Sequence, residues 1–130
     1  MLRGMATVSF YADDHEAAKA WYTEFLGIEP YFTVPGYAEW RVGDYRHELG
    51  LIDGKYAPAR QDGPGGEIVF WHVDDLEATV ARLLELGAKE YEPITERGPG
   101  FVTASVVDPF GNVLGVMTNV HYLAVLAERS

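Results

Sequence analysis

Two ionisable side chains in predicted strands could carry proton-transfer chemistry, Glu48 and His72. A carboxylate and an imidazole facing one ligand can act as acid and base, and both groups can also bind a metal ion. Each also has a structural explanation: Glu48 suits the rim of a sheet, and His72 suits a strand end with a local hydrogen bond. No His–Glu pair has metal-ligand spacing on one strand face, and the sequence supports no Ser-His-Asp arrangement. The catalytic residues are therefore unknown, with Glu48 and His72 as candidates.

The elements that would position these residues form an internal repeat. Both 8–27 and 69–87 read as a strand, the motif Asp-Asp-x-Glu-Ala, a helix and Leu-Gly. A strand with a central glycine follows in each copy, at 49–52 and at 114–117, the second after the turn sequence Asp-Pro-Phe-Gly-Asn. Two copies predict two paired modules rather than a solenoid, which needs at least three repeats.

The first module is predicted as βαβββ. Asp13 is the expected N-cap of its helix, with Glu16 completing a capping-box pattern and Gly27 ending the helix. The apolar stripe of this helix is expected at i, i+4 and i+8. The stripe residues are Ala17, Trp21 and Phe25, and the predicted strands are 7–12, 30–34, 37–42 and 45–53.

The second module repeats this order. Its helix is predicted from Asp75 to about Leu86, with Gly87 as its stop, and 96–100 reads as a mobile loop rather than a phosphate loop. The inward helix residues are expected to be Val80, Leu83 and Leu84, and the predicted strands are 67–73, 89–91, 101–107 and 113–118. We expect a single domain over 1–130, with modules 6–53 and 67–119, a Gly/Pro-rich linker 54–66 and a helical tail 120–130.

Composition limits the partners. The net charge of -10 argues against nucleic acid or an anionic membrane. It permits a cationic ligand only weakly, and a soluble acidic surface is the favoured explanation. The chain has no cysteine, which excludes disulfides and thiolate metal sites. No apolar run approaches the ~18 residues of a membrane span, and 1–4 lacks the apolar core of a signal peptide, so we expect a cytoplasmic protein.

The paired modules, the capped helices that end in Leu-Gly and the closing Asp-Pro-x-Gly-Asn strand resemble the vicinal oxygen chelate superfamily, across 6–119. That superfamily includes glyoxalase I, extradiol dioxygenases and bleomycin resistance proteins. The resemblance implies an α+β fold in which two βαβββ modules form an open, curved mixed sheet with a ligand cleft on its concave side. It also implies a homodimer.

The resemblance further implies four metal-ligand positions, which fall on Thr7, Gly50, Ile68 and Gly115. Two glycines and an isoleucine offer no side-chain ligand to a divalent metal. We therefore expect no metal and no cofactor. The two glycines would leave room in the cleft, although glycine is also tolerated where strands curve.

Strand alternation predicts which residues line the cleft. The expected lining is mostly apolar, with a few hydroxyls, one carboxylate and one imidazole, as in many small-molecule pockets. The lining residues are Thr7, Ser9, Tyr11, Glu48, Gly50, Ile52, Ile68, Phe70, His72, Thr103, Ser105, Val113, Gly115 and Met117. Tyr37, Trp40 and Tyr45 could stack on a planar or cationic ligand, but they could equally be core or dimer-interface aromatics.

The favoured hypothesis is a metal-free relative of glyoxalase and bleomycin resistance proteins that binds a small organic molecule, cationic or aromatic, in the cleft. The alternative is a glyoxalase-, isomerase- or dioxygenase-type enzyme that uses Glu48 and His72 as acid, base or atypical metal ligands. A third reading, a pathway-associated protein without a free ligand, stays open, because one fold can host unrelated chemistries.

Overall fold

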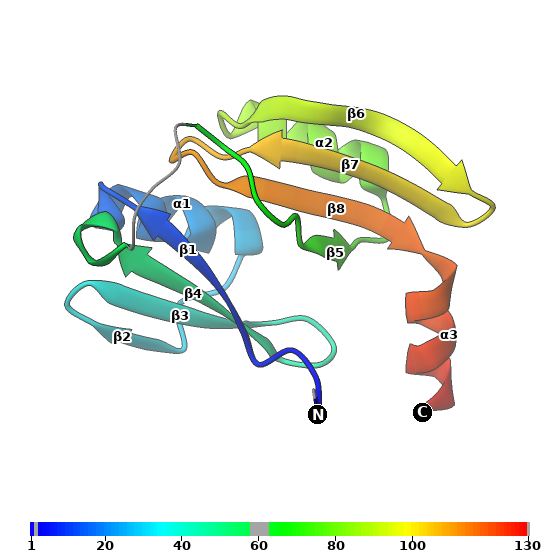
Figure 1. The fold of residues 1–130 in the computed structure, drawn as a ribbon, viewed down its shortest axis with the longest axis horizontal. Helices are drawn as coiled ribbons and strands as arrows, with labels where there is room; N and C mark the ends of the chain where they lie inside the picture. The colour runs from blue at the N-terminus through cyan, green and yellow to red at the C-terminus, as the bar shows by residue number, and fades with distance from the viewer. Residues whose placement is uncertain (2, 58–62, 130) are drawn as a thin grey trace. The chain divides into compact units, whose positions relative to one another are not determined.

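The computed structural model describes residues 1, 3–57 and 63–129. The chain divides into two compact units, unit 1 (Met1–Asp62) and unit 2 (Gly63–Ser130). Both contain the order βαβββ, so the predicted α+β fold of two such modules is confirmed (Figure 1). Unit 1 contains β1 (Thr7–Ala12), α1 (His15–Leu26), β2 (Phe32–Val34), β3 (Tyr37–Val42), β4 (His47–Asp53) and the short 3-10 helix η1 (Gly54–Tyr56). Unit 2 contains β5 (Phe70–His72), α2 (Leu76–Glu85), β6 (Lys89–Gly98), β7 (Phe101–Val107), β8 (Val113–Asn119) and α3 (Val120–Glu128).

Each unit contains one mixed sheet of four strands. The strand order is β1-β4-β3-β2 in unit 1 and β5-β8-β7-β6 in unit 2. The first strand of each unit pairs with the last strand in parallel, and the other pairs are antiparallel. A parallel pair requires a crossover connection, and the helix of each unit is part of it. The helix packs on one face of its own sheet, α1 in unit 1 and α2 in unit 2 (Figure 1).

The core of unit 1 lies between α1 and the sheet. Trp40 is fully buried, and its ring centroid lies 6.2 Å from that of Tyr22, which is also buried. The predicted stripe of Ala17, Trp21 and Phe25 is wrong in phase: Ala17 is exposed and the two aromatics are half-buried. The fully buried residues of α1 are Ala18 and Tyr22, each one residue after a predicted stripe position, together with His15.

His15 completes this stripe at the first turn of α1. The residue is 8% exposed, and its Nε2 lies 3.0 Å from the carbonyl oxygen of Leu51 on β4. A buried imidazole stays compatible with an apolar core when a ring nitrogen has a hydrogen-bond partner. His15 is therefore part of the helix–sheet packing in unit 1.

The helix caps follow the predicted chemistry with one correction. The N-cap of α1 is Asp14, not Asp13, because the Asp14 carboxylate accepts from the Ala17 N–H at 3.1 Å. Gly27 ends the helix in the left-handed region at φ 73°, as glycine allows. In α2, Asp75 is the N-cap and accepts from the Ala78 N–H at 3.0 Å.

Unit 2 departs from the predicted element bounds in two places. The predicted strand 67–73 has ladder pairing only over Phe70–His72. The predicted loop 96–100 is largely strand, since β6 runs to Gly98 with register shifts against β7, and only a tight turn separates the two strands. In α2 Leu83 is buried as predicted, but Leu84 is 45% exposed, so its predicted inward position is wrong.

The closing turn of unit 2 matches its prediction. The Asp108 side chain is buried and accepts from the Phe110 N–H at 2.9 Å and the Asn112 N–H at 2.8 Å. Asp and Asn favour turns because their side chains form such hydrogen bonds with nearby backbone groups. Part of the predicted linker, 58–62, lies outside the described residues. Among the helices of the described chain, none is long and apolar enough to cross a membrane.

Candidate ligand-binding site

The helix-free face of the sheet in unit 1 brings six sequence-predicted residues together. In the parallel pairing of β1 with β4, Thr7 is opposite Glu48, Ser9 opposite Gly50, and Tyr11 opposite Ile52. Residues opposite each other in a ladder share one face. Thr7 and Ser9 are exposed, Tyr11, Glu48 and Ile52 are half-buried, and Gly50 is buried.

Three further residues of this face come from β3. Tyr37 pairs with Ile52, Glu39 with Gly50, and Arg41 with Glu48. We call these three residues together with the previous six the open face of unit 1. Sequence reasoning missed Glu39 and Arg41 and left the face of Tyr37 unassigned. The alternation of Tyr37, Glu39 and Arg41 with Ala38, Trp40 and Val42 was the signal that could have found them.

The phenol of Tyr37 fills the space above Gly50. A Cβ atom placed on Gly50 would lie 2.9 Å from the Tyr37 hydroxyl and 3.1 Å from its ring. The hydroxyl donates a hydrogen bond of 2.8 Å to Glu39 Oε1. The glycine thus admits an aromatic ring over the strand, and this ring fixes a carboxylate beside it.

Burial raises the pKa of Tyr37 to about 12, and the hydrogen bond to Glu39 and the charges of Glu39 and Glu48 act in the same direction. An anionic phenolate would be poorly solvated there and repelled by two carboxylates. Tyr37 therefore remains a neutral hydrogen-bond donor across the physiological pH range.

Arg41 shows that the aromatic rings beside these carboxylates accept a cation. Its guanidinium carbon lies 3.8 Å from the centroid of the Tyr31 ring, within the range of a cation–π contact. The Arg41 Nε lies 4.0 Å from Glu39 Oε2, and the Glu39 side chain is only 14% exposed. Tyr31 and Phe32 are exposed, and the Phe32 ring lies 6.4 Å from that of Tyr37.

We call Tyr31, Phe32, Tyr37, Glu39, Arg41 and Glu48 the acidic–aromatic cluster of unit 1. The two other aromatics considered from the sequence do not belong to it. Trp40 is a core residue against α1, and Tyr45 lies 5.9 Å from His47, whose position in β4 places it on the helix side.

In unit 2 the register places six predicted residues in two rows on the helix-free face of the sheet. One row contains Phe70, Gly115 and Ser105, and the next contains His72, Met117 and Thr103. Ser105 is fully buried and donates to Glu92 Oε1 at 3.1 Å. Arg97 donates to the Thr103 hydroxyl at 3.1 Å and lies 3.6 Å from Glu92. Val113, a further predicted residue, is buried opposite Val107.

Gly115 repeats the arrangement of Gly50. A Cβ atom there would lie 2.7 Å from the Phe70 ring, 2.7 Å from the Val69 carbonyl oxygen and 2.9 Å from Ile68 Cγ2. In both units an aromatic side chain from a neighbouring strand thus occupies the space above the glycine. This space is filled by the protein itself and is not an open part of a cleft.

His72 is engaged by its own unit. The Asn119 N–H donates to its Nδ1 at 3.2 Å, and the Tyr122 ring is stacked on the imidazole with centroids 4.7 Å apart. Its Nε2 is buried and lies 3.5 Å from Asp74 Oδ1. These contacts are those of a histidine that holds the end of β5 to the start of α3.

The four metal-ligand positions implied by the resemblance do not fit a divalent metal. Gly50 and Gly115 have no side-chain donor, and Ile68 is apolar, which leaves the Thr7 hydroxyl as the only side-chain oxygen. Tyr37 and Phe70 close the space above the two glycines. Within the described residues, no group of three or more His, Cys, Asp and Glu side chains could hold a metal ion.

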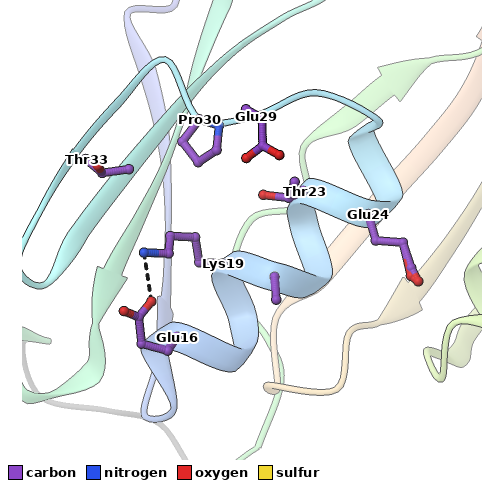
Figure 2. A pocket seen from close by; sticks show the side chains of 8 residues that line it. Glu16, Lys19, Thr23, Glu24, Glu29, Pro30 and Thr33 are labelled. Atoms are coloured by element: carbon purple, nitrogen blue, oxygen red, sulfur yellow. Dashed lines mark ion pairs between the residues drawn. The ribbon is translucent and has the colours of Figure 1, made fainter.

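A groove of about 440 Å³ lies on the other side of unit 1, between α1 and the segment that leads into β2 (Figure 2). Its charged lining is mainly acidic, with Glu16, Glu24 and Glu29. Figure 2 shows the Lys19 amino group directed at Glu16, and the two groups are 2.8 Å apart. Lys19 lowers the pKa of Glu16 through this contact. The sequence analysis predicted a capping role for Glu16 and no ligand-binding role for these residues.

Comparison with known proteins identifies the family. The model of the Glyoxalase/Bleomycin resistance protein/Dioxygenase superfamily matches residues 4–116, so this chain belongs to that superfamily. This confirms the resemblance seen in the sequence. No curated protein matches the chain.

Solved structures show the same fold. A glyoxalase-related enzyme from Fulvimarina pelagi is 20% identical, with a TM-score of 0.72 over 92% of this chain and 90% of that one. A protein from Agrobacterium tumefaciens solved by NMR is 19% identical, with a TM-score of 0.75 over 91% of this chain and 98% of that one. A lactoylglutathione lyase from the same organism is 24% identical, with a TM-score of 0.68 over 90% and 94% of the two chains.

Proposed function

We propose that this chain binds a small organic cation with an aromatic ring on the open face of unit 1, without a metal ion. One observation carries the proposal: the Glu39 carboxylate, held by Tyr37 above Gly50, lies beside exposed aromatic rings. A carboxylate fixed by a neutral donor keeps its charge for a ligand and needs no reorganisation on binding.

The ligand class follows from the charges and rings of the acidic–aromatic cluster. Glu39 and Glu48 supply two negative charges, and Arg41 supplies one positive charge that lies over Tyr31. A ligand cation can take the place of the guanidinium on the Tyr31 ring while its own ring contacts Phe32 or Tyr37. The net charge of -10 also raises the encounter rate with cations.

Three residues of β1 that strand alternation predicted are also part of the proposed site. Thr7, Ser9 and Tyr11 lie on the same face of unit 1 as the cluster and offer it hydroxyl groups. Pairing with a second copy of the chain is also proposed, and exposed apolar side chains such as Val120 and Leu123 support it. Sedimentation equilibrium would test this pairing.

The alternative function, an enzyme that uses Glu48 and His72 as acid and base, stays a prediction. The contacts of His72 do not favour it, because Asn119 and Tyr122 engage the imidazole. The binding function is favoured since the acidic–aromatic cluster needs no contribution from His72.

The test is an NMR titration of ¹⁵N-labelled protein with N-methylquinolinium, a flat aromatic cation. We expect the largest amide shifts in β3 and β4, around Glu39 and Gly50. The variant Glu39→Gln/Glu48→Gln should weaken binding about tenfold or more, because the ligand cation loses its attraction to two nearby carboxylates.

The matched control is Glu77→Gln/Glu90→Gln, which changes the net charge equally but alters exposed carboxylates of unit 2. It should leave the affinity within about twofold. Arg41→Met should strengthen binding, because the Tyr31 ring loses its internal cation. Equal weakening by both double variants, or shifts that avoid β3 and β4, would refute the proposed site.

A further inference from the structure

Two hydrogen bonds donated by backbone N–H groups connect the start of helix α3 to the rest of unit 2. The Asn119 N–H donates to His72 Nδ1 at 3.2 Å, and the Val120 N–H donates to the Gly100 carbonyl at 3.1 Å. Asn119 also caps the helix, because its Oδ1 accepts from the Tyr122 N–H at 2.9 Å. No residue of α3 is fully buried, and Tyr122, Val125 and Leu126 are half-buried.

The Asn119 contact fixes the protonation state of His72. Since a backbone N–H can only donate, Nδ1 must be the unprotonated acceptor of a neutral ring, and the proton is on Nε2. The Nε2 atom lies 3.5 Å from Asp74 Oδ1. The ring is largely shielded, with 9% of the His72 side chain exposed, whereas 97% of the Asp74 side chain is exposed.

We propose that neutral His72 acts as a latch for helix α3 and that protonation of His72 releases the first turn of this helix. In the imidazolium both ring nitrogens are donors, so Nδ1–H would face the Asn119 N–H and the hydrogen bond would be lost. The stacked Tyr122 ring and the N-cap of α3 depend on the same placement of Asn119.

Some groups around His72 favour the protonated imidazole and others favour the neutral one. Asp74, on the connection between β5 and α2, attracts the imidazolium, and Tyr122 on α3 presents an uncharged ring face. Met117 on β8, the strand neighbour of His72, carries no charge. The Asn119 N–H opposes protonation at Nδ1, so the charged ring gains most by turning toward Asp74.

The test is amide hydrogen exchange followed by NMR at about pH 5.5 and about pH 7.5, on either side of the usual histidine range. Exchange is corrected for its intrinsic pH dependence, and the amides of α2 serve as the internal reference. Protection at Asn119, Val120 and Tyr122 should fall about fivefold to tenfold at the lower pH, as expected for the loss of one hydrogen bond. The α2 amides should not change.

Two variants separate the latch from general acid sensitivity. His72→Asn places an amide oxygen where Nδ1 was and cannot titrate, so its α3 protection should be independent of pH. His121→Asn, on α3 itself and exposed, is the matched control and should behave like the wild-type chain.

Equal protection of α3 at both pH values in the wild-type chain would overturn the proposal. So would a pH-dependent loss of protection that persists in His72→Asn, because another group would then control the helix. If His72→Asn fails to fold, loss of the pH dependence in His121→Asn would still overturn it, because His121 would then control the helix.

Discussion

At the residue scale, the two units fill the space above corresponding glycines with an aromatic side chain. Tyr37 lies over Gly50 in unit 1, and Phe70 lies over Gly115 in unit 2. The two rings differ in one atom that matters chemically: the Tyr37 hydroxyl reaches a carboxylate, whereas Phe70 offers only an apolar edge. An aromatic ring therefore covers the glycine in both units, but only the ring in unit 1 carries a hydroxyl group.

A methyl group at either glycine should destabilise the fold. Gly115→Ala should lower the free energy of unfolding by about 1–3 kcal/mol, the usual cost of overpacking. The backbone carbonyl of Val69 is among its closest neighbours and cannot easily move. Gly50→Ala should cost less, since the nearest atom is the end of the Tyr37 side chain. Urea denaturation measures both values.

The double variant Gly50→Ala/Tyr37→Phe checks the cause. Removing the hydroxyl removes the atom 2.9 Å from the new methyl group, so the pair should cost less than the sum of the single changes. Additive costs would mean that the Tyr37 hydroxyl is not what limits the space above Gly50.

Tyr37 should lose its proton at a higher pH than ordinary tyrosines do. Its pKa is raised to about 12, which means that folding favours the protonated phenol. The resulting stabilisation is complete below about pH 10, the ordinary tyrosine value, and is lost as the pH rises through about 12. Absorbance at the tyrosinate band measures the titration. Glu39→Gln should bring the titration of Tyr37 closer to the ordinary tyrosine value, because the negative charge beside the phenol is removed.

The control for this titration is Tyr37→Phe. It should delete the late component and leave the earlier ones unchanged. If Tyr37→Phe instead removes a tyrosinate signal that appears near pH 10, the phenol of Tyr37 is not shielded as its contacts indicate.

At the element scale, the sequence predicted strands well where alternation and turn residues coincide. The bounds of β1, β3 and β7 agree with their predictions, because a clear period of two ends at a strong turn signal in each. The predicted bounds were wrong where pairing with a neighbouring strand determines how far a strand extends. Glu67 to Val69 have strand-like composition but no complete ladder, and Glu96 to Gly98 extend β6 despite their loop-like composition.

The helix starts show a second limit of sequence reasoning. Two adjacent aspartates precede each helix, and both can cap, so the sequence alone does not choose between them. The structure chooses the second in each unit, Asp14 and Asp75. The buried face of α1 also includes His15, which no periodicity argument had placed in the core.

Removing either cap should destabilise its helix. Asp14→Ala and Asp75→Ala should each cost about 1 kcal/mol, because a side-chain acceptor for a first-turn N–H is lost. Asp14→Asn and Asp75→Asn keep the acceptor and should recover most of the loss. Thermal unfolding followed by circular dichroism measures the differences. If the Asn variants are as unstable as the Ala variants, charge at the helix end outweighs the hydrogen bond.

At the scale of the whole molecule, the chain is a member of the Glyoxalase/Bleomycin resistance protein/Dioxygenase superfamily whose implied metal positions hold unsuitable residues. Strand alternation predicted from the sequence which side chains share a face, including Thr7, Ser9 and Glu48. It could not predict that Tyr37 would cover Gly50 or that α3 would engage His72. Both depend on how side chains from different elements meet, and only the folded chain decides this.

The central claim is that the cluster around Glu39 and Glu48 recognises positive charge on an aromatic ligand. The most direct measurement is isothermal titration calorimetry with N-methylquinolinium and with quinoline, its uncharged counterpart, at about pH 8 and in the presence of EDTA. We predict that the wild-type chain prefers the cation by about tenfold or more and that Glu39→Gln/Glu48→Gln loses this preference. Equal binding of the two compounds by the wild-type chain, or binding that EDTA abolishes, would contradict the proposed function.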